Sequence, residues 1–117
     1  HSNFGGKPHE WAHQRDVLRE HCAAVGRDPD EITMTWSPGV FVRETEAEVA
    51  AELERVRPAW ESAESWVAGN LVGTPEQVLD RIRDYQGLGC QGFVLWPADL
   101  PDTGTVRLLG EQVLPAL

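Results

Sequence analysis

The segment His9-Glu10-Trp11-Ala12-His13 has the H-E-x-x-H spacing that zinc peptidases use. In that chemistry the two histidines bind zinc and the glutamate activates a zinc-bound water. On a helix, His9 and His13 would lie opposite Trp11, on a face with acidic residues. A solvated face of this kind disfavours the hypothesis of a small zinc peptidase that uses His9, Glu10 and His13.

Other nucleophiles have no catalytic partners in the sequence. Cys22 lies on an apolar helical stripe and Cys90 begins a predicted strand, so both are interpreted as small core residues. Two cysteines are too few for a disulfide scaffold. No Ser/His/Asp set and no paired carboxylates are supported by spacing, and the catalytic residues are therefore unknown.

The elements that position these residues follow from periodicity. The first six residues suggest no regular element. Residues 8–25 predict a helix that Gly26 ends, and residues 32–36 alternate as a short strand that 40–42 continue after Ser37-Pro38-Gly39. The expected inward side chains of the helix are Trp11, Leu18, Cys22 and Val25.

The second half begins with a helix whose N-terminus is marked by Thr45 and Glu48, and which Pro58 should kink or split. Thr74 is a natural N-cap for the next helix, ahead of Pro75 at its first position and Gln77. An apolar strand over 93–96, buried on both faces, and a last helix from Thr105 complete the prediction. The expected inward side chains are Val49, Leu53, Val56 and Trp60 in the helix after Thr45, Val78, Ile82 and Tyr85 in the helix after Thr74, and Val106, Leu109 and Val113 in the last helix.

The composition narrows the class of partner. The chain has 117 residues, with 10 basic against 19 acidic ones and a net charge of −9. An acidic balance without basic runs argues against nucleic acid and membrane surfaces, and no apolar stretch is long enough to span a membrane. We expect a cytoplasmic α/β domain that covers residues 1–117.

The strand count predicts an incomplete sheet. Two firm strands with three or four helices leave apolar strand edges without partners, and a complete eight-fold β/α barrel needs about 200 residues or more. We therefore expect missing sequence, a second copy or another chain to complete the sheet.

Four stretches, in this order along the chain, resemble one family. They are Val25-Gly26-Arg27-Asp28-Pro29-Asp30-Glu31-Ile32, Gly73-Thr74-Pro75-Glu76-Gln77-Val78-Leu79-Asp80-Arg81-Ile82, Leu88-Gly89-Cys90-Gln91-Gly92-Phe93-Val94-Leu95 and Glu111-Gln112-Val113-Leu114-Pro115. Together they are similar to the C-terminal portion of the luciferase-like flavin- and deazaflavin-dependent oxidoreductases, a family that includes monooxygenases. The resemblance covers nearly the whole chain.

The resemblance implies a partial, truncated β/α barrel: the last βα units of a TIM-type barrel with parallel strands. It further implies FMN or a 5-deazaflavin coenzyme at the C-terminal mouth of the strands, and a small-molecule substrate. The glycine-rich phosphate-binding segment of the family lies upstream of this chain, so we expect no activity without the rest of the barrel.

Five residues at strand ends are expected to line the cofactor pocket. Asn3 resembles a polar residue that ends a family strand, and the others end the two clear strands. For the two tryptophans the alternative is packing against loops or helices, and for the aspartate an exposed loop acid or cap. The candidates are Asn3, Trp36, Ser37, Trp96 and Asp99.

Two hypotheses from different classes follow. The first is an enzyme portion, an oxidoreductase that acts when the remaining barrel segment is present. The second is a non-catalytic binding module that self-associates through its open strands.

Overall fold

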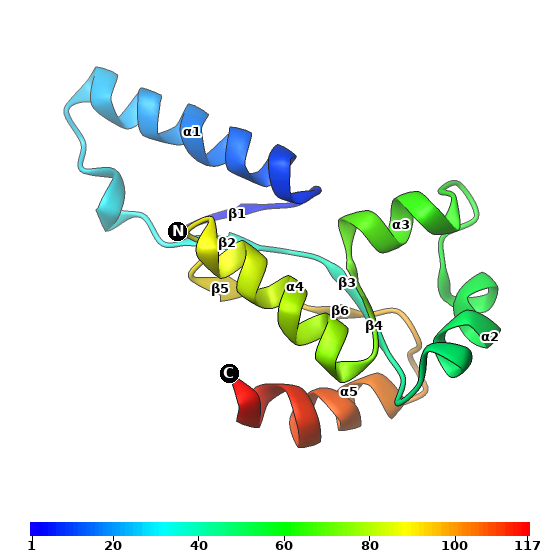
Figure 1. The fold of residues 1–117 in the computed structure, drawn as a ribbon. Coiled ribbons are helices and arrows are strands. Elements are labelled where there is room, and N and C mark those ends of the chain that lie inside the picture. The colour runs from blue at the N-terminus through cyan, green and yellow to red at the C-terminus, as the bar shows by residue number, and fades with distance from the viewer.

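The computed structural model describes residues 1–117 as parallel strands with helices packed against them (Figure 1). The strands are β1 (Ser2–Phe4), β2 (Met34–Trp36), β3 (Gly39–Val42), β4 (Leu71–Gly73), β5 (Gly92–Phe93) and β6 (Trp96–Pro97). The helices are α1 (Pro8–Val25), α2 (Glu46–Val56), α3 (Ala63–Gly69), α4 (Pro75–Gly87) and α5 (Gly104–Leu108). Short helical turns span Pro29–Glu31, Leu109–Val113 and Leu114–Ala116.

Every strand pairing is parallel, and the stretch formed by β2 and β3 lies in the centre. Strand β2 lies between β1 and β5, and β3 lies between β4 and β6. The central stretch is interrupted at Ser37-Pro38, because proline has no N–H to donate to a neighbouring strand. The Pro38 carbonyl still accepts a hydrogen bond from the Trp96 amide at 3.1 Å.

The strands form two small sheets, each open at both edges. Strands β1 and β5 in one sheet, and β4 and β6 in the other, each pair on one side only. The radius of gyration is 15.4 Å, whereas a compact domain of this length has about 13 Å. Open parallel edges and an extended shape are what a partial barrel produces, so the predicted fold class is confirmed.

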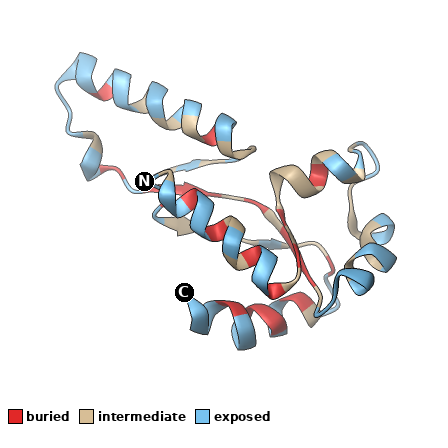
Figure 2. Cartoon of the chain, in the orientation of Figure 1, coloured by how far each residue is buried: buried red, intermediate tan, exposed pale blue.

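The core lies between the strands and the helices on one face. The Trp36 ring stacks on Tyr85, with centroids 3.5 Å apart and planes 8° apart, and Trp11 contacts Tyr85 edge-on at 6.2 Å. Burial raises the pKa of the Tyr85 hydroxyl, which donates to the Gly6 carbonyl at 2.7 Å. Figure 2 shows the buried residues of α4 and α5 facing the strands, and Val78 and Ile82 are buried there as predicted.

The helix ends follow the predicted signals. Thr74 Oγ1 accepts from the Gln77 amide at 3.4 Å, and Gln77 Oε1 accepts from the Thr74 amide at 3.0 Å. Gly26 ends α1 with a φ of 73°, a left-handed conformation that favours glycine. Helix α2 ends at Val56, two residues before Pro58, so the helix stops where a kink or split was predicted.

Some expected core positions are wrong. Val25 and Val106 are exposed, and Trp60 is 88% exposed in the loop between α2 and α3. Helix α2 has no buried residue, since it packs only beside the end of the sheet; Val49, Leu53 and Val56 are half-buried. A hydrophobic stripe indicates one face of a helix but not whether another element covers that face.

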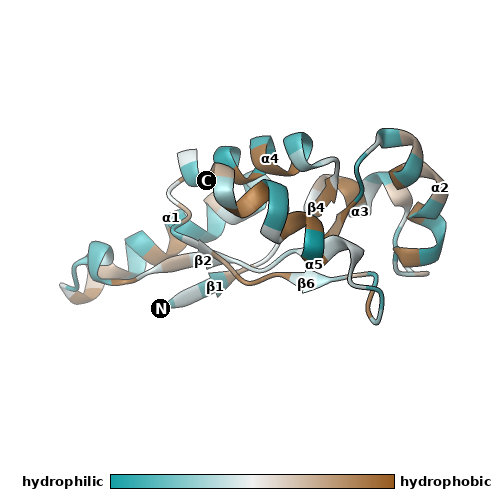
Figure 3. Cartoon of the chain, turned by 90° about the horizontal axis from the view of Figure 1, so that it is seen from below, coloured by the Kyte–Doolittle hydropathy of each residue, from teal (hydrophilic) through white to brown (hydrophobic).

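The sequence patterns predict neither helix α3 nor strand β4, and two further segments need correction. The first six residues contain β1, which no periodicity could indicate over three residues; it forms by pairing Asn3 with Thr35. The predicted strand over 93–96 is split into β5 and β6, and Val94 is 42% exposed. Burial on both faces fails for this segment, because α4 and α5 lie on one side of the strands (Figure 3) while Val94 and Trp96 are exposed.

Candidate functional site

We call the face of the strands opposite α4 and α5 the uncovered face. It carries three of the five predicted site residues, namely Asn3, Ser37 and Trp96. Met34 and Trp36 belong to the core cluster, so Thr35 between them points the other way, as does Asn3 in register with it. Trp96 is 64% exposed. In a closed barrel this face is the interior.

Hydrogen bonds fix the polar side chains at the β1–β2 end of the uncovered face. Thr35 Oγ1 donates to Asn3 Oδ1 at 2.8 Å, and His1 Nε2 lies 2.9 Å from the same hydroxyl. The strand register brings Asn3 and Thr35 together, because side chains of residues paired in parallel strands project to the same side of the sheet. Asn3 is thus a positioned polar group on the predicted interior.

Ser37 and Trp96 meet at the break between β2 and β3. The indole Nε1 of Trp96 donates to Ser37 Oγ at 2.9 Å, so the indole has a fixed hydrogen-bond partner although it is largely exposed. An exposed aromatic ring anchored at one end can support a flat ligand. The two residues form an accessible, hydrogen-bonded pair on the uncovered face.

Trp36 lies on the opposite side. Its side chain is 0% exposed and packs against Tyr85 and Phe93. Its Nε1 is buried without a hydrogen-bond partner. The structure therefore places Trp36 in the helix-side core and apart from the uncovered face, and its role as a pocket wall stays a prediction.

Asp99 lies at the end of β6 in a buried ion pair. Its Oδ2 accepts from Arg43 Nη1 at 2.9 Å and from the Thr105 amide at 3.1 Å. Arg43 also binds Glu52 at 2.7 Å and lies 3.6 Å from Asp102. Burial by itself raises the pKa of Asp99, but the hydrogen bonds from Arg43 and Thr105 outweigh it and lower that pKa below its ordinary value.

This arrangement corrects the alternative interpretation of Asp99 as an exposed loop acid. Asp99 is 2% exposed and joins the end of β6 to the end of β3 and the start of α5. No local pattern indicated this pairing, since Arg43 and Asp99 are 56 positions apart. Its cofactor-binding role stays a prediction.

The H-E-x-x-H segment lies on the exposed side of α1. His9, Glu10 and His13 are exposed, and Glu10 Oε2 accepts a hydrogen bond from the Lys7 amide at 2.7 Å, closing the helix N-terminus. No group of three or more His, Cys, Asp or Glu side chains is arranged to hold a metal ion. The zinc-peptidase hypothesis has no third ligand in this structure.

Both cysteines are free and buried, as predicted. Burial raises the pKa of the Cys90 thiol, which favours the unreactive protonated form. Neither sulfur is a candidate nucleophile.

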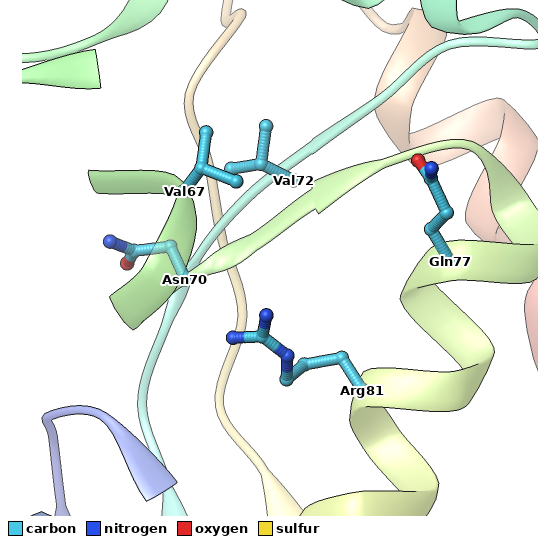
Figure 4. A pocket seen from close by; sticks show the side chains of 5 residues that line it. All are labelled: Val67, Asn70, Val72, Gln77 and Arg81. Atoms are coloured by element: carbon cyan, nitrogen blue, oxygen red, sulfur yellow. The ribbon is translucent and has the colours of Figure 1, made fainter. Parts of the chain in front are cut away.

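A cavity of about 260 Å³ lies between the end of α3, β4 and the first turns of α4 (Figure 4). Arg81 points into it, but its Nη1 donates to the Ala68 carbonyl at 2.7 Å. Gln77 holds the N-cap of α4 and donates to Glu46 at 2.7 Å. These side chains join α3 and α2 to α4, which is a structural role.

A second cavity, of about 320 Å³, lies where β1 and β2 end. Its lining contains no hydrophobic residue, and Ser37 connects it to Trp96 on the uncovered face. Sequence reasoning missed this polar cavity because its residues come from the loop after β1, the start of α1, the break between β2 and β3, and α3 with its flanking residues. It is lined by Gly6, Lys7, Glu10, Ser37, Glu61, Ser65, Gly69 and Asn70.

Comparisons with known proteins bear on the fold. No protein-family model matches the chain, and no curated protein matches it. No helix combines the length and apolar character needed to cross a membrane.

Solved structures do match. A riboflavin lyase solved with modified FMN and riboflavin has a TM-score of 0.74 and 21% identity over 99% of this chain and 37% of its own. A long-chain alkane monooxygenase has a TM-score of 0.73 and 22% identity over 98% of this chain and 35% of its own. A coenzyme F420 dependent tetrahydromethanopterin reductase from Methanopyrus kandleri has a TM-score of 0.71 and 14% identity over 97% of this chain and 44% of its own.

The chain thus spans well under half the length of these proteins. Nearly all of it superposes on them, and its two small sheets are open at their edges where a barrel would continue. The chain therefore has the fold of part of these flavin- and F420-dependent enzymes, a partial β/α barrel, as the sequence resemblance predicted.

Proposed function

We propose that residues 1–117 form one domain that supplies part of the cofactor site of a cytoplasmic, luciferase-like oxidoreductase. The observation that carries the proposal is the uncovered face, on which Trp96 is exposed and anchored to Ser37. The other barrel strands, from the same polypeptide or another chain, would close the site. We expect no turnover without them, because barrel active sites draw residues from several strands.

The residues of the uncovered face suit a flavin or a deazaflavin. Both cofactors carry a flat ring with hydrogen-bonding edges, which matches an anchored indole beside serine and asparagine groups. Trp96 would support the ring, while Ser37 and Asn3 would offer polar contacts to it. When bound, the cofactor supplies hydride transfer or, for a flavin, oxygen chemistry on a small-molecule substrate.

Replacing Trp96 with alanine should weaken cofactor binding about tenfold, since loss of an aromatic contact costs about 1.4 kcal/mol. The measurement is a fluorescence titration with FMN, and separately with a deazaflavin, of the purified polypeptide that carries these residues. Trp60→Ala is the matched control, because Trp60 is an exposed tryptophan in the loop between α2 and α3 and not on the strands. Unchanged affinity in Trp96→Ala would contradict the proposal.

A second candidate function is favoured by the open edges of β1 and β5. Unpaired apolar strand edges tend to recruit another strand. We propose that, without the remaining barrel segment, a second copy covers them and the chain acts as a self-associating binding module. Sedimentation velocity should then show a dimer or larger species, and a stable monomer across micromolar concentrations would exclude this candidate.

A further inference from the structure

The polar cavity has a lining that sets it apart from an aromatic-ring site. Its volume of about 320 Å³ suits a small molecule, and none of its lining residues is hydrophobic. A flat apolar ligand would leave the polar groups of the lining without partners, which is unfavourable. The occupant should therefore present polar or charged groups to this lining.

Lys7 is the only lysine of the chain and is half-buried in this lining. Its ammonium group takes part in none of the ion pairs of the structure, all of which have nitrogen–oxygen distances of at most 4.0 Å. Two carboxylates, those of Glu10 and Glu61, line the same cavity. Opposite charges thus share one cavity without pairing with each other.

Each of these groups keeps free hydrogen-bonding capacity. Glu10 uses Oε2 on the Lys7 amide, and Glu61 uses Oε1 on the Ser65 hydroxyl at 2.9 Å. The second oxygen of each carboxylate has no partner in the protein. Ser37 accepts from Trp96, so its own O–H remains able to donate.

We propose that the polar cavity binds a small zwitterion that carries one carboxylate and one ammonium group. Its carboxylate would bind the Lys7 ammonium and the Ser37 hydroxyl, and its ammonium would bind Glu10 and Glu61. A ligand with only a negative charge would be repelled by two carboxylates, and a ligand with only a positive charge would be repelled by the Lys7 ammonium. Only a molecule with both charges satisfies the free groups at once.

This inference names a substrate class for the proposed oxidoreductase and rests on that function for the substrate's role. Ser37 provides the connection, because it lines the polar cavity and holds Trp96. Binding is measured without flavin, so failure of the zwitterion site and failure of the cofactor site are separate results.

The test is calorimetric titration of the purified polypeptide with a series of ω-amino acids: β-alanine, γ-aminobutyrate and δ-aminovalerate. Propionate and propylamine are the single-charge controls. At least one ω-amino acid should bind tenfold or more tightly than either control, since charge-assisted hydrogen bonds at both ends act together. Equal binding of propionate, or no binding of any ω-amino acid, overturns the proposal.

Two variants locate the site. Lys7→Met should weaken binding of the best ω-amino acid at least tenfold. Glu61→Gln should weaken binding of the same ω-amino acid but should not weaken binding of propionate. Arg83→Met is the matched control, because Arg83 is exposed and pairs with Asp80 on α4. Unfolding curves that match the parent show that Lys7→Met is folded, and unchanged affinity in that variant overturns the assignment.

Discussion

Replacing Trp36 with alanine is expected to lower the free energy of unfolding by about 3–5 kcal/mol. The Trp36 ring is fully buried, stacks on Tyr85 and meets Phe93 edge-on at 6.2 Å. Its removal leaves a cavity where α4 packs on β2. Because domains are stable by only about 5–15 kcal/mol, this loss is a large share of the total.

Urea unfolding followed by circular dichroism measures the effect. Trp60→Ala is the control for loss of a tryptophan, and we expect a change within about 0.5 kcal/mol because Trp60 is 88% exposed. Trp36→Phe keeps an aromatic ring and removes the unpaired indole N–H, so its loss should be smaller. If Trp36→Ala kept full stability and lost only cofactor affinity, Trp36 would be a pocket wall and not a core residue.

Replacing Arg43 with methionine is expected to cost about 3–5 kcal/mol, because it leaves the Asp99 carboxylate buried without its cation. Asp99 Oδ1 already lacks a hydrogen-bond partner, so Arg43 and Thr105 provide the contacts that stabilise the charge. The double variant Arg43→Met with Asp99→Leu should recover part of the loss, since it removes both charges. Equal losses in the single and double variants would contradict this account.

The same pair makes stability depend on pH. The pKa of Asp99 is lower in the folded state than its ordinary value of 3.8. A group with a lowered folded pKa stabilises the fold at neutral pH, and this contribution disappears as the pH falls below 3.8 through the folded value. When urea midpoints are measured between pH 7 and pH 2, the midpoint should decrease below pH 3.8. In the Asp99→Asn variant this decrease should be smaller. Arg83→Met, at an exposed pair, should behave as the parent does.

Local signals in the sequence predicted those elements whose ends are marked by side chains. Thr74, Pro75 and Gln77 define the start of α4 because the cap is formed within four residues, and Gly26 ends α1 for the same reason. The order of family-like stretches predicted the C-terminal portion of a barrel, and the open parallel sheet agrees with it. Incompleteness itself followed from counting strands.

Of the five candidate site residues, the sequence could place each near a strand end but could not say which face it occupied. Trp36 and Ser37 are neighbours, yet the first lies in the core and the second lines the polar cavity. The strand break at Pro38 and the contact with Trp96 decide this; the break is a local signal, but the contact depends on a strand distant in the chain. The buried position of Asp99 depends on its ion pair with Arg43, which only the fold brings within 2.9 Å.

The sequence by itself determined the caps of α1 and α4 and the shortage of strands, because these depend on neighbours in the chain and on its length. Only the tertiary structure decided that β1, α3 and β4 exist, that Asn3, Ser37 and Trp96 share an uncovered face, and that Lys7, Glu10 and Glu61 line one cavity. Such contacts join segments tens of residues apart. Their energy comes from parallel register and packing against helices on one side, which no local pattern encodes.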